Sequence, residues 1–187
     1  MKLNCYRILA CLGAVLLLAA CGSAKHPYDA TADNNGFYVQ SGGVVYQLQI
    51  SRELNPYAVE DHQYLMGLPA GTPSPGSKRL WYGVFLWAKN HGKHSAMTAS
   101  SFDIVDTRGK MYHPVALDPS LNQYAWSAKT LSPLGTEPAP NTTASFGPTQ
   151  GSLLLFELDT TAYADRPLTL EIHPPGTTQT STISLDL

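Results

Sequence analysis

Hydrophobic and polar residues alternate in short segments along most of the chain, from residue 37 to its end. In the first of these segments Tyr46, Leu48 and Ile50 are separated by glutamines, so we expect the three on the buried face of a half-buried strand. Turn-forming residues separate one segment from the next. The segments with strand character are 44–50, 80–90, 101–106, 110–117, 153–158, 168–172 and 183–187. This pattern predicts a protein built almost entirely of β-strands.

The turns and loops indicate how the strands are joined. Asp106-Thr107-Arg108-Gly109 has aspartate at the first position and glycine at the fourth position of a type I turn, which predicts a β-hairpin. The 14 prolines are spread along the chain, and two long loops contain groups of them. Short helical turns are expected only at 55–68 and 122–131. Strands do not alternate with helices, which excludes a doubly wound nucleotide-binding fold. We therefore expect an all-β, immunoglobulin-like antiparallel β-sandwich with long proline-rich loops and one or two short helical turns.

Segment 80–90 is the strongest predicted strand, and both of its faces are apolar. Its aliphatic row should face the core of the sandwich, while Trp81, Phe85 and Trp87 form a row on the opposite face. We expect 53–76 or a proline-rich loop to cover this aromatic row. The alternative is an exposed patch for a hydrophobic ligand, a glycan or a partner protein. Aromatic residues on loops would extend such a patch: Tyr57, Tyr64, Tyr124 and Trp126.

The amino terminus follows another pattern. Lys2 and Arg7 accompany an apolar run at 8–18 that is too short to span a bilayer, which is typical of a secretory signal peptide. Leu18-Ala19-Ala20-Cys21-Gly22 comes next and matches the bacterial lipobox at every position. The small residues allow a peptidase to bind the backbone in extended form, and the thiol accepts a diacylglyceryl group. We therefore expect a lipid anchor on Cys21.

This interpretation divides the chain into three parts. Residues 1–20 are the predicted signal peptide, 21–36 a flexible polar tether, and 37–187 a single domain. The expected location is the extracytoplasmic face of a bacterial cell membrane. The alternative is an ordinary secretory signal cut near Ala20, which would leave Cys21 as a free thiol.

Cysteine content and charge limit the chemistry of the mature chain. Cys5 and Cys11 lie in the part that is removed, so no disulfide and no cysteine-based metal site is expected. Without Lys2 and Arg7 the formal net charge of −2 becomes about −4, which argues against binding to nucleic acid. The expected partners are membrane lipid, through Cys21, and an envelope protein or a glycan.

A set of motifs spread over 80–172 resembles a known family. They are a strand ending in Lys89-Asn90, a glycine turn at Gly92, the run 101–112 (SFDIVDTRGKMY) and the later run 151–158 (GSLLLFEL). In this combination they are similar to a domain of unknown function that is common in small bacterial lipoproteins. The resemblance implies an immunoglobulin-like, telokin-like sandwich at the cell surface, and it implies no catalytic residues.

Candidate chemistry is sparse. The nucleophile and zinc motifs G-x-S-x-G, S-x-x-K and H-E-x-x-H are absent. His91 and His94, with His113 and Asp103 as additional ligands, could hold zinc or copper or serve a hydrolase, but 90–94 is also an ordinary polar turn after a strand. His62 and His173 are weaker candidates. We expect no metal and no cofactor.

Three classes of function remain. The sequence favours a non-catalytic binding or accessory module of the cell envelope. The first alternative is a structural or antigen-like surface protein without a small ligand. The second is a metal-binding or hydrolytic enzyme, which would need a deep polar pocket where histidines and carboxylates converge.

Overall fold

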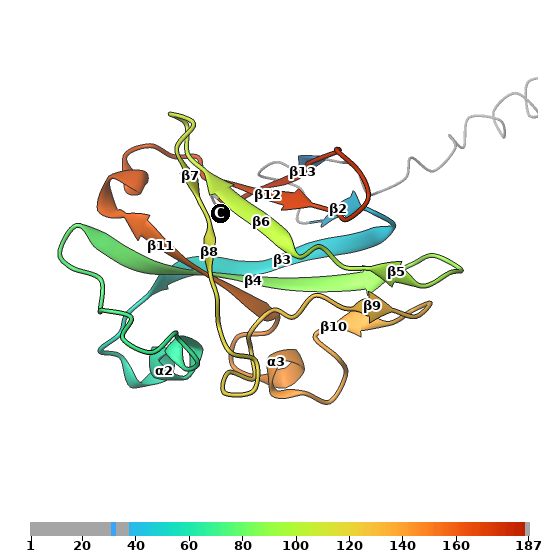
Figure 1. Cartoon of the computed structure of the whole chain (residues 1–187), viewed down its shortest axis with the longest axis horizontal. Helices are drawn as coiled ribbons and strands as arrows, with labels where there is room; N and C mark the ends of the chain where they lie inside the picture. Colours follow the sequence, from blue (N-terminus) through green and yellow to red (C-terminus); the bar gives the residue numbers. More distant parts are fainter. Residues whose placement is uncertain (1–30, 33–37, 186–187) are drawn as a thin grey trace, which may run out of the picture.

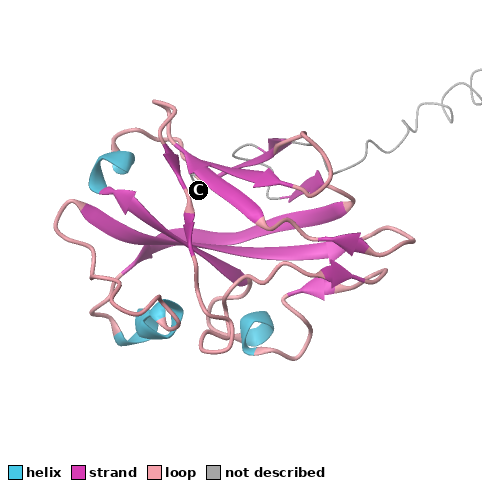
Figure 2. Ribbon diagram, viewed as in Figure 1, coloured by secondary structure: helices cyan, strands magenta, loops and turns pink. Residues whose placement is uncertain are grey.

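The computed structural model describes residues 31–32 and 38–185, and Figures 1 and 2 show their arrangement. The predicted signal peptide and Cys21 lie outside the described residues. Strand β1 (Thr31–Ala32) belongs to the segment expected to be a tether, and it pairs in parallel with β13 (Ser181–Ser184). No helix in the described part of the chain has the length and apolar character needed to cross a membrane.

Two sheets form the body of the domain. The larger has the order β2-β3-β4-β11-β8, and a further short strand, β10, pairs with β4. Its strands are β2 (Tyr38–Ser41), β3 (Val44–Leu54), β4 (Arg79–Asn90), β8 (Pro114–Val115), β10 (Thr136–Glu137) and β11 (Ser152–Asp159). All the pairs within this sheet are antiparallel.

The smaller sheet has the order β1-β13-β12-β6-β7. Its remaining strands are β6 (Ser101–Val105), β7 (Met111–Tyr112) and β12 (Thr169–His173). A separate two-stranded ribbon joins β5 (Ala96–Met97) to β9 (Thr130–Leu131). The hairpin expected at 106–109 is confirmed, because β6 and β7 pair across it and the Gly109 N–H donates to the Asp106 carbonyl at 2.9 Å.

The main core lies between the two sheets. Side chains of β3, β4 and β11 from the larger sheet pack there against β6, β12 and β13 from the smaller one. Its largest fully buried members include Tyr46, Leu86, Phe102 and Phe156. The predicted antiparallel β-sandwich is therefore confirmed, with its core formed by the alternating residues of both sheets.

Short helices lie at the loops. They are α2 (Val59–His62), the 3₁₀ turn η1 (Gln63–Leu65), α3 (Thr143–Phe146) and the 3₁₀ turn η2 (Thr160–Tyr163). The helical turns expected in 55–68 are confirmed. Those expected in 122–131 are wrong, because the Trp126 N–H donates to the Leu153 carbonyl at 2.9 Å and the Leu153 N–H donates to the Tyr124 carbonyl at 2.6 Å. These bonds hold residues 124–126 beside β11.

A β-bulge in β3 changes the expected face of one residue. Leu48 pairs with Leu86 and Ile50 with Phe85, so the register shifts by one residue between them. Leu48 is buried between the sheets, whereas Ile50 is exposed. The prediction that Ile50 shares the buried face is wrong, because the extra residue of a bulge reverses the alternation beyond it.

Both faces of β4 are covered. The aliphatic row faces the main core, and Trp81 and Phe85 of the aromatic row belong to a second cluster beneath the larger sheet. Figure 1 shows α2 and α3 on this side of the sheet, away from the smaller one. Tyr64, Leu65 and Leu68 from 53–76 pack on this cluster together with Tyr124 and Ala144.

The expectation that loops cover the aromatic face is therefore confirmed for Trp81 and Phe85. Trp81 and Phe85 are 2% and 0% exposed, so they offer no patch to a partner, and Trp87 is half-buried. Of the loop aromatics, Tyr64 and Tyr124 are buried in the cover, whereas Tyr57 is exposed.

Candidate functional site

Three polar side chains meet on the outer face of the smaller sheet. On β6, Phe102 and Ile104 point into the core, so the alternation places Asp103 on the opposite face. Glu171 on β12 lies directly across from Asp103 in the register, and His173 is two residues further along the same strand. The three share one face because each belongs to the polar half of an alternating strand.

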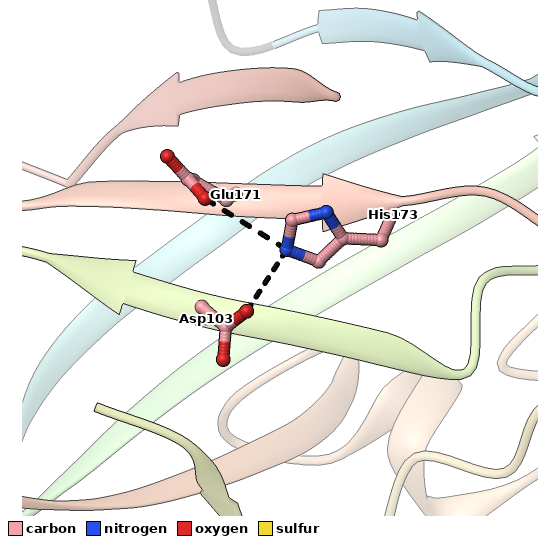
Figure 3. Close-up of side chains that lie close together, drawn as sticks. All are labelled: Asp103, Glu171 and His173. Atoms are coloured by element: carbon pink, nitrogen blue, oxygen red, sulfur yellow. Dashed lines mark hydrogen bonds and ion pairs between the residues drawn. The ribbon is translucent and has the colours of Figure 1, made fainter. Parts of the chain in front are cut away.

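The contacts converge on one imidazole nitrogen, as Figure 3 shows. Nε2 of His173 lies 2.9 Å from Oδ2 of Asp103 and 3.8 Å from Oε2 of Glu171. The Asp103 side chain is only 11% exposed, while Glu171 and His173 are partly exposed. A largely buried carboxylate needs hydrogen-bond partners, and the imidazole of His173 is one of them.

His113 adds a second imidazole to Asp103. Its Nδ1 contacts Oδ1, the carboxylate oxygen that His173 does not use. His113 is the single residue between β7 in the smaller sheet and β8 in the larger one, so it lies where the chain crosses between the sheets. Its side chain is 74% exposed.

A groove of about 550 Å³ opens beside this crossover. Asp103, Ser101 and His113 form a polar end. The rest of the lining is mainly apolar: Phe102, Pro114, Val115, Ala116, Leu117, Trp126, Leu153 and Leu154, with Ser100. The groove exists because β8 has only two residues and pairs with β11 only at Leu155 and Phe156, which leaves the earlier part of β11 uncovered by β8.

Trp126 is fixed at the wall of the groove. Its Nε1–H donates to the Ala99 carbonyl at 3.0 Å, and its ring packs edge-to-face on Phe102 with centroids 5.3 Å apart. The ring is half-buried, so it keeps an accessible edge. An indole held in this way presents a rigid surface to a ligand at little entropic cost.

The structure brings together only some of the candidates found in the sequence. Asp103 and His113 are in contact, as a shared site would require. His91 and His94 are exposed in the turn after β4, where the Asn90 side chain accepts from the Gly92 N–H and donates to the His94 carbonyl. Within residues 38–185 the group able to share a metal ion is Asp103, Glu171 and His173, so the turn histidines are not part of it.

The sequence alone does not indicate Glu171 as a site residue, and it makes His173 only a weak candidate. The signal was present, because in Thr169-Leu170-Glu171-Ile172-His173 the two polar residues alternate with buried aliphatic ones, as Asp103 does on β6. What the local pattern does not give is the pairing of β12 with β6, which joins positions about 70 residues apart.

Comparisons with known proteins support the fold. No model of a protein family matches the sequence, and no curated protein matches it. The yjhA protein from Bacillus subtilis superimposes with a TM-score of 0.51 at 12% identity, over 80% of this chain and 96% of its own. A "putative lipoprotein (ycdA)" from Bacillus subtilis subsp. subtilis str. 168 does so with a TM-score of 0.50 at 13% identity.

The second similarity covers 80% of this chain and 38% of the ycdA chain, so this chain spans well under half the length of that protein. At such identities the comparisons show a shared fold and nothing finer. No match supports the telokin-like family that the motifs resemble. The chain is a β-sandwich protein whose fold is shared with these bacterial proteins.

Proposed function

We propose that the protein is a non-catalytic binding module of the bacterial cell envelope, anchored through lipid on Cys21 to the outer face of a membrane. The anchoring rests on the lipobox at 18–22. The binding role rests on one observation, the groove beside the crossover from β7 to β8. Its volume falls within the range of about 300–1,000 Å³ that is usual for small-ligand sites.

The lining indicates the kind of ligand. An apolar wall at Val115, Leu117 and Trp126 fits a flat or branched apolar group. The polar end carries the Asp103 carboxylate, which fits a hydrogen-bond donor or a positive charge. A ligand with one apolar part and one donor group, such as a short peptide segment of an envelope protein, satisfies both ends.

The hydrogen bonding of the site favours binding over catalysis. Ser100 and Ser101 line the same groove as His113, yet within residues 38–185 no serine hydroxyl is hydrogen-bonded to this imidazole, whose partner is Asp103. A serine hydrolase needs a hydroxyl within hydrogen-bond reach of its histidine. The groove therefore fits an accessory protein better than a hydrolase.

Two matched variants, each replacing an exposed alanine by tryptophan, test the proposal. Ala116 is exposed and lines the groove, and Ala70 is exposed in the loop between η1 and β4 and does not line it. The lipidated protein and the variants Ala116→Trp and Ala70→Trp are crosslinked in membranes, and the captured molecules are identified by mass spectrometry. An indole at position 116 should occupy part of the groove and prevent capture, while the indole at position 70 should leave capture unchanged.

Two outcomes would contradict the proposal. Capture that persists in Ala116→Trp would place binding elsewhere on the domain. A wild-type protein that captures no molecule beyond background would favour the structural or antigen-like role. Melting temperatures of both variants within a few degrees of the wild type would show that the loss reflects the filled groove rather than unfolding.

A further inference from the structure

We propose that Asp103, Glu171 and His173 form a binding site for a divalent transition-metal ion of the zinc class. The site lies on the outer face of the smaller sheet, where β6 and β12 pair (Figure 3). This replaces the expectation from the sequence that no metal binds, and it uses residues other than His91 and His94.

The distances are close to those of a metal centre. One oxygen or nitrogen atom from each of the three residues can be chosen so that all lie within 4.8 Å of one another. In a tetrahedral zinc site with bonds of about 2.0–2.1 Å, neighbouring ligand atoms are about 3.3 Å apart. The distances from His173 Nε2 to Asp103 and Glu171, 2.9 and 3.8 Å, lie on either side of this value. Small rotations of two partly exposed side chains would complete the geometry.

The other nitrogen of His173 has a partner suited to metal binding. The Thr180 hydroxyl lies 3.3 Å from Nδ1. When Nδ1–H donates to this hydroxyl, Nε2 carries its lone pair and faces the two carboxylates. Histidines that bind metals usually donate their second ring N–H in this way, which fixes both the tautomer and the orientation of the ring.

His113 acts as a positioning residue rather than a ligand. It contacts the Asp103 oxygen that faces away from His173, so it leaves the other oxygen directed at the site. Ligating carboxylates are commonly held by such a hydrogen bond. Three protein ligands leave at least one position of a four-coordinate ion open to water or to a ligand.

The donor set identifies the class of metal. One imidazole with two carboxylates suits zinc and the other first-row transition metals, whereas calcium and magnesium prefer oxygen ligands alone. The two carboxylates face one nitrogen from adjacent strands, and a cation among them offsets the repulsion between their negative charges.

Titration of the full chain with Zn²⁺ by isothermal calorimetry tests the site, together with the visible absorption spectrum of bound Co²⁺. We expect one ion per chain and a higher melting temperature with Zn²⁺. Asp103→Asn, Glu171→Gln and His173→Gln should each weaken Zn²⁺ binding at least tenfold. His94→Gln, which removes an exposed histidine outside the cluster, should bind as the wild type does. Glu171 is partly exposed, so its variant serves as the test even if the other two fail to fold.

Several results would overturn the proposal. Absence of saturable Zn²⁺ binding in the wild type would overturn it, and would mean that the three side chains only share hydrogen bonds. A folded Glu171→Gln protein with wild-type affinity would exclude the site, as would loss of binding in His94→Gln alone. An equal rise in melting temperature with Ca²⁺ would contradict the assigned class of metal.

Discussion

Arg52 on β3 and Asp61 on α2 form a paired hydrogen bond that ties the covering loop to the larger sheet. The two terminal guanidinium nitrogens of Arg52 donate to the two carboxylate oxygens of Asp61 at 3.1 and 2.5 Å. The Asn55 N–H also donates to this carboxylate at 2.8 Å. Asp61 is buried and Arg52 is about one-third exposed. The loop that buries the aromatic face of β4 is thus held by charge as well as by apolar packing.

This pair predicts loss of stability in acid. The hydrogen bonds from Arg52 lower the pKa of Asp61 below its ordinary value of 3.8, against the opposing effect of burial. Because the folded-state pKa is the lower one, the stabilisation is complete well above pH 3.8 and disappears as the pH falls through the folded-state value. Asp61→Asn should cost about 1–3 kcal/mol at neutral pH. Urea unfolding at pH 7 and at pH 2.5 measures this cost.

The cost of Asp61→Asn should shrink at pH 2.5, because below pH 3.8 the unfolded wild type takes up a proton at Asp61, and the stabilisation from the ionised pair decreases as the pH falls further. Glu60→Gln is the control, since Glu60 is the exposed neighbour and forms no part of the pair. It should unfold as the wild type does at both values. A cost for Asp61→Asn that is the same in acid and at neutral pH would show that the pair contributes no pH-dependent stability.

Asn122 holds the same cover through a different set of bonds. Its buried amide donates to the carbonyls of Tyr64 and Met66 at 3.0 and 2.9 Å and accepts from the Tyr124 N–H at 2.9 Å. Asn122→Ala would remove the partners of three backbone groups and should cost about 1–3 kcal/mol. Chemical denaturation measures the change, and Gln123→Ala, at an exposed neighbouring position, should lie within about 0.5 kcal/mol of the wild type. Equal stability of the two variants would contradict this role for Asn122.

The features predictable from the sequence were those set by neighbouring residues. The 106–109 hairpin depends on the residues of its own turn. The backbone N–H groups of Arg108 and Lys110 both donate to the Asp106 side chain at 2.9 Å. The covered face of β4 followed from the alternation within one strand. Both features depend on residues close together in the sequence, so each could be predicted from one segment.

The features that were missed depend on contacts between distant segments. Nothing in the alternation at Leu48 and Ile50 marks the bulge, because both residues are apolar and are separated by a single polar residue. The lack of a helix in 122–131 results from bonds to distant segments, those of Tyr124 and Trp126 to Leu153 in β11 and those of Thr130–Leu131 to β5, which override its helical propensity. The candidate metal site was missed for the same reason, because it exists only once Glu171 pairs with Asp103.

Lipid anchoring is a prediction of the sequence alone, and Cys21→Ser tests it. Without the thiol no diacylglyceryl group can be attached, so the lipoprotein peptidase should leave the precursor uncleaved. Each buried methylene of an acyl chain contributes about 0.8 kcal/mol to membrane binding, so the anchor should be lost as well. Labelling with a palmitate analogue measures acylation, and gel mobility measures cleavage. Labelling that persists in Cys21→Ser would contradict the assignment.

Neighbouring residues of β4 should differ in their cost to stability. Phe85 is fully buried beneath the larger sheet, where its ring packs edge-to-face on Tyr64 with centroids 5.0 Å apart. Phe85→Ala should therefore cost about 3–5 kcal/mol. Leu86 is fully buried on the other face, between the sheets, and Leu86→Ala should cost about 2–5 kcal/mol.

Trp87 shares the face of Phe85 but lies near the end of the strand and is only half-buried. Its replacement by alanine removes less buried area and leaves a partly open space, so Trp87→Ala should cost clearly less than Phe85→Ala. Thermal and urea unfolding of the three variants measure the loss of stability in each, and so the order of the three costs. A stable Leu86→Ala protein would contradict the register of β4 in the sandwich. A Trp87→Ala protein as unstable as Phe85→Ala would contradict this order. It would mean that the loops bury Trp87 as fully as Phe85, because the cost of removing an aromatic side chain rises with the area that it buries.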